Sequence, residues 1–143
     1  MKDNPKVRAA FFHAGSHLEE KFIEAENIET VRDLIEGHEK ALIACHKLKI
    51  GKKTYSVIHD VYKKRDINYN SETIPSVTND NYGTIFFGNV IICNAGKNCF
   101  LSLTKEDFKN IQSHIGFLIG SDMSSTFLFP AIRTNDETLK RDF

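Results

Sequence analysis

The stretch that decides the fold is GTIFFGNVIICNAGKNCFLSLTKEDFKNI, residues Gly83–Ile111. Its apolar run Thr84–Cys93 predicts one buried strand, and the Asn- and Gly-containing residues Asn94–Asn98 predict a tight turn. A short second strand, Cys99–Leu103, is expected to follow. The stretch contains no carboxylate pair, metal-ligand spacing, nucleophile motif or phosphate loop, so it predicts architecture rather than chemistry.

A well-capped helix is predicted at the end of this stretch. Thr104 suits the N-cap, and Asp107 stands three residues later, which is a capping box with Asp in place of Glu. Leu103, just before the cap, is placed to pack on Phe108 as a hydrophobic staple. Gly116 is expected to end the helix.

Before this stretch, the chain predicts a hairpin followed by a short helix. Val7–Phe12 reads as a buried strand and His17–Glu24 as a half-exposed one, joined by a turn. Asn27 is a good N-cap for a helix over about residues 28–36, and Gly37 supplies a stop. The apolar positions of this segment recur with helical spacing.

A second hairpin is predicted from Ala41–Ile50 and Lys53–Tyr62, joined at Gly51-Lys52. A two-residue loop would make His46 and His59 diagonal neighbours on one face. That face is apolar enough to be the buried one. Its members are Leu42, Ala44, His46, Leu48, Ile50, Tyr55, Val57, His59 and Val61.

The remaining segments are a long loop and a tail. Lys63–Tyr82 shows no sustained periodicity, and a loop of this length is unusual in a compact domain. We expect one domain over residues 1–143, with a core over about 7–116 and a C-terminal extension over 117–143. Most connections are too short for crossovers, which favours an α+β fold: a mainly antiparallel sheet with two short helices packed on one face.

Composition narrows the class of protein. The 19 basic and 19 acidic residues balance, and 41% of the residues are hydrophobic, as in a soluble globular domain. The balance disfavours a dedicated duplex-binding domain. The three cysteines fit no disulfide framework or zinc spacing, and they are expected to be reduced. No membrane-spanning run or signal peptide is visible, so we expect a cytoplasmic protein with no membrane partner.

Three segments together carry a resemblance to a known family. NIETVRDLIEG (Asn27–Gly37), GTIFFGNVII (Gly83–Ile92) and LSLTKEDFKNI (Leu101–Ile111) resemble an uncharacterised small-protein family, a domain of unknown function common on bacterial phages and mobile elements. The resemblance covers about residues 7–115, and the G-Y-I-E segment of that family is absent here. It implies a phage or mobile-element origin and assigns no catalytic residue.

Histidines are the only candidates for a metal site. His46 and His59 would lie within reach of each other, and the turn containing His13 and His17 would have to supply a third ligand. No H-E-x-x-H motif or carboxylate triad accompanies them. We expect no catalytic residue, no bound metal and no cofactor. A small metal-dependent hydrolase around His46 and His59 is kept as the second alternative function.

Lysines gather along the second predicted hairpin. The candidates for contact with a nucleic acid or nucleotide are Lys47, Lys49, Lys52 and Lys53. With tyrosines nearby, they suit a groove for single-stranded nucleic acid, in which cations meet phosphates and rings stack on bases. The simpler interpretation is a solvated sheet edge that lysines protect from pairing. A nucleic-acid or nucleotide binder is therefore the first alternative function.

The leading hypothesis is a non-enzymatic intracellular binding protein that acts through protein–protein contacts. The expected partner surface combines the long loop with the apolar tail, and its residues are Lys63, Lys64, Arg65, Tyr69, Phe127, Phe129 and Ile132. The tail segment is either an apolar partner patch, which would also suit a homodimer, or an edge strand docked on the main sheet. With a phage origin, the expected role is inhibition of a host defence system such as a CRISPR-type nuclease complex.

Overall fold

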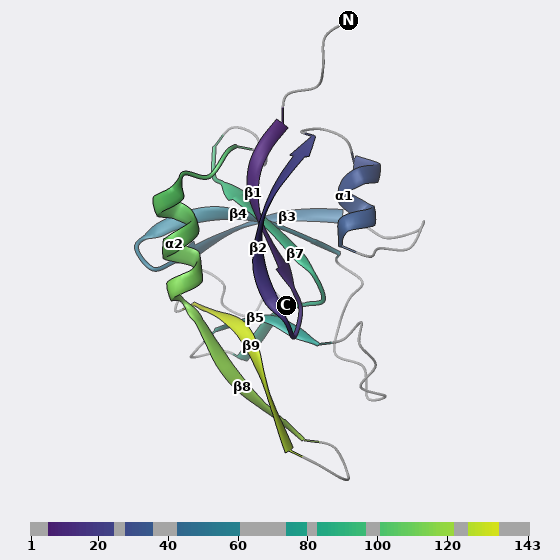
Figure 1. Ribbon diagram of the computed structural model, residues 1–143, viewed down its shortest axis with the longest axis vertical. Coiled ribbons are helices and arrows are strands. Elements are labelled where there is room, and N and C mark those ends of the chain that lie inside the picture. Colours follow the sequence, from purple (N-terminus) through teal and green to yellow (C-terminus); the bar gives the residue numbers. More distant parts are fainter. Residues whose placement is uncertain are drawn as a thin grey trace, which may run out of the picture.

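The computed structural model describes residues 6–24, 28–35, 43–60, 74–79, 83–96, 101–121 and 126–134 (Figure 1). The strands are β1 (Lys6–His13), β2 (His17–Glu24), β3 (Ile43–Ile50), β4 (Lys53–Asp60), β5 (Pro75–Asn79), β6 (Gly83–Phe87), β7 (Val90–Asn94), β8 (Ile115–Ser121) and β9 (Thr126–Thr134). The helices are α1 (Ile28–Leu34) and α2 (Lys105–Ser113). Five strands form one sheet in the order β2-β1-β7-β4-β3, and four form a second in the order β6-β5-β9-β8.

The predicted α+β class, with both helices packed on one face of the sheet, is wrong. Strands dominate the described residues, and the two helices lie on opposite sides of the five-stranded sheet (Figure 1). Val31 and Ile35, at α1, pack with Phe11 on one face. Ile111 of α2 packs with Tyr55 on the other. The physical reason is that the central strands are apolar on both faces, so each face needs its own cover.

The second sheet shares one of these faces with α2. Val77 of β5, Phe86 of β6 and Ile132 of β9 belong to the same buried cluster as Ile111. The cluster also takes in the inward residues of the five-stranded sheet: Ala10, Phe12, Leu48, Ile50, Tyr55, Val57, Val90 and Ile92. This layer between the two sheets is the larger of the two cores.

The apolar run Thr84–Cys93, predicted as one strand, is split between the two sheets. β6 ends at Phe87 and β7 starts at Val90, and Gly88 between them has a φ of 79°. A left-handed φ is readily adopted only by glycine, so Gly88 breaks the run. Its amide donates to the Ile74 carbonyl at 2.8 Å, which fixes the break beside β5.

Part of the predicted loop Lys63–Tyr82 is also a strand. Pro75–Asn79 forms β5, which pairs antiparallel with β6 and parallel with β9. Pairing on both sides gives this short segment its order, although its sequence has no clear alternation. The rest of that loop, residues 63–73 and 80–82, lies outside the described residues.

Both predicted hairpins and the cap of α2 are confirmed. His46 lies opposite Val57 and Ala44 opposite His59, as the two-residue loop required. In the N-terminal hairpin, His13 lies opposite His17. The helix that was expected to run to Gly116 ends at Ser113 instead, and β8 begins at Ile115. Neither described helix has the length and apolar character needed to cross a bilayer.

Candidate functional site

The β8–β9 hairpin forms an arm that projects from the rest of the described chain (Figure 1). Three of its large apolar side chains are mostly exposed: Phe117 at 68%, Ile119 at 74% and Leu128 at 66%. Ile119 pairs with Leu128, and Phe117 pairs with the half-buried Pro130. Paired residues share a sheet face, so these four form one surface, called the apolar arm face below.

The edge of this arm lacks the usual protection against pairing. Among the described strands, β8 pairs only with β9, so it is the edge of the second sheet. Its sequence, IGFLIGS, contains no charged residue and no proline. Natural edge strands are commonly blunted by lysines, prolines or bulges. An uncharged apolar edge is therefore an acceptor for another strand.

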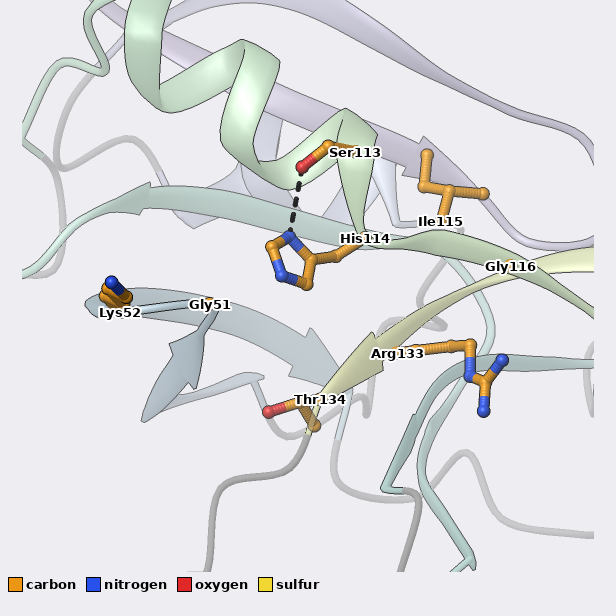
Figure 2. A pocket seen from close by; sticks show the side chains of 8 residues that line it. All are labelled: Gly51, Lys52, Ser113, His114, Ile115, Gly116, Arg133 and Thr134. Atoms are coloured by element: carbon orange, nitrogen blue, oxygen red, sulfur yellow. Dashed lines mark hydrogen bonds between the residues drawn. The ribbon is translucent and has the colours of Figure 1, made fainter.

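A pocket of about 500 Å³ lies at the foot of the arm (Figure 2). It is lined by Gly51, Lys52, Ser113, His114, Ile115, Gly116, Arg133 and Thr134. Three elements meet there: the β3–β4 turn, the end of α2 and the start of the arm. In Figure 2, Lys52 and Arg133 lie on opposite sides of His114. The described lining residues include two cations and no carboxylate, so they favour an anionic group.

His114 is held in one tautomer at the centre of this pocket. Its Nδ1 lies 2.8 Å from the Asn110 carbonyl oxygen, which only accepts, so Nδ1 carries the proton. In the neutral ring, Nε2 is then an acceptor. Gly51 approaches this ring so closely that a Cβ there would lie 2.9 Å from His114 Cε1. The φ of Gly51 is also +67°, so a glycine is needed here for two reasons.

The predicted histidine pair exists, with His59 buried and His46 half-buried. His46 Nδ1 lies 2.6 Å from His59 Nε2, and Phe86 packs on the His59 ring at 4.2 Å between centroids. Burial, and to a smaller extent the neighbouring His46, lower the pKa of His59 to about 4. The described part of the chain brings no third ligand to this pair. Its contacts are those of a structural pair that supports the layer between the sheets.

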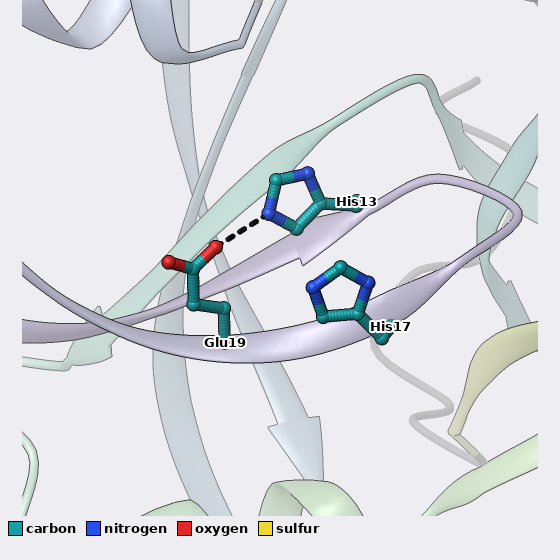
Figure 3. A group of neighbouring side chains, drawn as sticks. All are labelled: His13, His17 and Glu19. Carbon is teal, nitrogen blue, oxygen red and sulfur yellow. Dashed lines mark hydrogen bonds and ion pairs between the residues drawn. The ribbon is translucent and has the colours of Figure 1, made fainter.

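A different histidine group lies at the tip of the β1–β2 hairpin (Figure 3). His13, His17 and Glu19 place their ligand atoms within 4.8 Å of one another. The sequence drew attention to His13 and His17 but missed Glu19. The signal that could have found it is the period of two: Glu19 follows His17 by two residues, so both point to one face of β2.

The four hairpin lysines do not form one patch. Lys47 and Lys49 lie on the face of β3 opposite the larger core and are exposed, whereas Lys52 lines the pocket. Lys53 instead contacts Asp107 of α2, with Nζ 2.6 Å from Oδ1. The structure thus separates these residues into three surroundings.

The residues predicted for the partner surface fall into different places. Ile132 is fully buried in the larger core, and Phe129 is half-buried on the arm. Lys63, Lys64, Arg65 and Tyr69 lie outside the described residues, as does the side chain of Phe127. The exposed apolar residues of the arm, Phe117 and Ile119, were not singled out from the sequence.

The cysteines differ from the reduced set expected. Cys45 is disulfide-bonded, whereas Cys93 is a buried free thiol whose pKa burial raises to about 12. Cys99 lies outside the described residues. A thiol with so high a pKa is inert, so Cys93 acts as a core residue.

The arm, the pocket at its foot and the histidine group are therefore the surfaces that can carry function in the described structure. Each is assembled from segments that lie apart in the sequence or on alternating positions of a strand. Among known proteins, no family model, no curated protein and no solved structure matches this chain.

Proposed function

We propose that this chain is a non-enzymatic binding protein that holds an extended segment of a partner protein along β8. The observation that carries this proposal is the apolar arm face, where Phe117, Ile119 and Leu128 are each about two-thirds exposed or more. Large exposed apolar surfaces on soluble proteins mark interaction sites. Covering one such side chain completely contributes about 1.5–3 kcal/mol.

The edge of β8 supports an extended partner segment in particular. A segment that adds to a sheet edge gains main-chain hydrogen bonds, and its alternate side chains contact one face of the sheet. The spacing of Phe117 and Ile119, two residues apart on one face, suits apolar side chains at alternate positions of the partner.

The pocket supports an acidic group on the same segment. Its cations, Lys52 and Arg133, lie at the foot of the arm. Arg133 is on the face of β9 opposite Leu128 and Pro130, so it suits an acidic side chain that alternates with the apolar side chains of the partner segment. Such charges speed association and fix the register of a partner more than they add affinity. The partner segment is thus apolar over its length and carries a carboxylate or phosphate at one end.

The class of partner follows from the resemblance to a phage and mobile-element family. A small protein of such origin that binds through a surface is suited to inhibit a host machine, such as a CRISPR-type nuclease complex. The support for this narrower role is that resemblance together with the small size of the chain. A nuclease assay with the partner complex identified below tests it directly.

The test uses a photoreactive benzoylphenylalanine in place of Ile119 in the full chain, expressed in the host. The matched control carries it at Leu118, the neighbouring position on the other face of β8. We expect a partner protein to be crosslinked from position 119. The partner sequence around the crosslinked site should contain alternating apolar residues and one acidic group. A synthetic peptide of that segment should bind at least tenfold more weakly to both F117S/I119S and K52E/R133E.

Three other outcomes would overturn the proposal. A crosslink to a second copy, with a dimer mass by light scattering, assigns the arm to self-association. Binding that K52E/R133E weakens and F117S/I119S leaves unchanged assigns the pocket to a free anion such as a nucleotide. Equal crosslinking from positions 118 and 119 removes the apolar arm face as the binding surface.

A further inference from the structure

We propose that His13, His17 and Glu19 form a binding site for a divalent transition-metal ion, with zinc as the ion that this donor set fits. Two imidazoles and one carboxylate are a common set of protein ligands for zinc with an open position. This site lies on the β1–β2 hairpin and is independent of the arm and the pocket. The proposed binding of a partner segment along β8 does not depend on this metal site.

The hairpin itself brings the three side chains together. His13 and His17 are directly opposite each other in the β1–β2 register, at the end of both strands. Glu19 lies two residues further along β2, on the same face. Figure 3 shows the two rings side by side, with the Glu19 carboxylate turned toward His13.

The distances are close to those that an ion requires. His13 Nε2 lies 2.7 Å from Glu19 Oε2, and the rings of His13 and His17 stack with centroids 4.5 Å apart. All three ligand atoms lie within 4.8 Å of one another. Donors around a tetrahedral zinc ion are about 3.3 Å apart, since each lies about 2.0–2.2 Å from the metal. The planes of the two stacked rings are 18° apart, so their in-plane lone pairs are nearly parallel, and the side chains must rotate before both rings can bind one ion.

An ion pair between His13 and Glu19 leaves the role of His17 unexplained. His17 is exposed, yet its Nδ1 lies 2.8 Å from Ser16 Oγ, which orients the ring and leaves Nε2 for a ligand bond. Hydrogen bonds of this kind on the second ring nitrogen accompany most metal-binding histidines. The His13–Glu19 ion pair does not require His17, whereas a metal ion would use the His17 imidazole as its third donor.

The hairpin turn is held in place from outside. The Ala14 amide donates to Asn89 Oδ1 at 2.8 Å, and Gly15, with a φ of 77°, lies against the side chain of Ile74. A fixed turn keeps His13 and His17 in register.

The site is open to solvent on one side. The side chains of His13 and Glu19 are 33% and 41% exposed, so an ion can enter. Three protein donors leave a fourth tetrahedral position for water or for an anionic group. The chemical class of ligand is therefore a borderline divalent cation that accepts nitrogen and oxygen donors.

The experiment titrates zinc chloride into the metal-free full chain by calorimetry. We expect one equivalent to bind, and E19Q and H17A each to weaken binding at least tenfold, the usual order for a lost ligand or its support. E20Q is the matched control, because Glu20 points to the other face of β2, where it contacts Arg8 at 3.7 Å. It should bind zinc like the wild type. Cobalt in place of zinc should give a visible absorption band that E20Q keeps and H17A loses.

Two results would overturn the site. One is a full chain that takes up no zinc under these conditions. The other is zinc binding that H17A and E19Q leave unchanged, since the ion is then held elsewhere, for example at His46. His17 is exposed, so H17A should keep the wild-type melting temperature, and circular dichroism checks that its loss of binding is not a loss of fold.

Discussion

At the scale of single residues, the protonation of His59 is linked to folding. It is 7% exposed, it lies 2.6 Å from His46, and Phe86 covers its ring. Burial penalises the charged imidazolium, so the pKa falls from 6.5 to about 4 in the folded chain. The unfolded chain therefore binds more protons than the folded chain between these two values.

Because the pKa of His59 is lower in the folded chain than in the unfolded chain, its contribution to the free energy of unfolding is fully present above pH 6.5. This contribution is lost as the pH falls toward 4. For one histidine, a difference of this size corresponds to about 3 kcal/mol in the free energy of unfolding. Urea unfolding at a series of pH values measures it, with His59→Gln as the comparison. The variant should show a clearly flatter dependence, and equal slopes for both chains would contradict this account.

At the scale of elements, α2 owes its start to its own cap. Thr104 Oγ1 accepts from the Asp107 amide at 3.1 Å, and the Thr104 amide donates to Asp107 Oδ2 at 2.9 Å. Thr104→Ala should cost about 1 kcal/mol, the usual loss for an N-cap. Lys109→Ala, an exposed change in the middle of the same helix, is the control and should shift the urea midpoint little. Equal midpoints for wild type and Thr104→Ala would remove the cap as a source of stability.

Elements with local signals were predictable, and those that depend on distant partners were not. The β3–β4 hairpin and the α2 cap are set by a two-residue turn and by residues three apart, so the sequence shows them. The split at Gly88 depends on β5 and β9, which draw β6 into a different sheet from β7. The same holds for the candidate sites. The two-residue period of a strand could have placed Glu19 on the same face as His17, whereas the pocket lined by Gly51, His114 and Arg133 forms only in the tertiary fold.

At the scale of the whole molecule, β9 belongs to both the core and the arm. Ile132 is fully buried, whereas Leu128, four residues earlier on the same strand, is 66% exposed. Ile132→Ala should lower the free energy of unfolding by about 2–5 kcal/mol, as for other large core residues. Leu128→Ala should change it by no more than about 0.5 kcal/mol. Thermal melts of the two variants side by side check the difference, and a cooperative, unshifted melt for Ile132→Ala would contradict this placement.

The parallel pairing of β5 with β9 also sets the order in which the chain can fold. Val77 of β5 pairs with Ile132 of β9, and β1 pairs antiparallel with β7. Both sheets therefore contain pairs of strands that are far apart in the sequence. Contacts of this kind make folding slow, because a long loop must close before they form. During synthesis, the edge of β5 that pairs with β9 stays unpaired until Thr126–Thr134 has left the ribosome. In that interval the nascent chain is a substrate for chaperones that bind apolar segments.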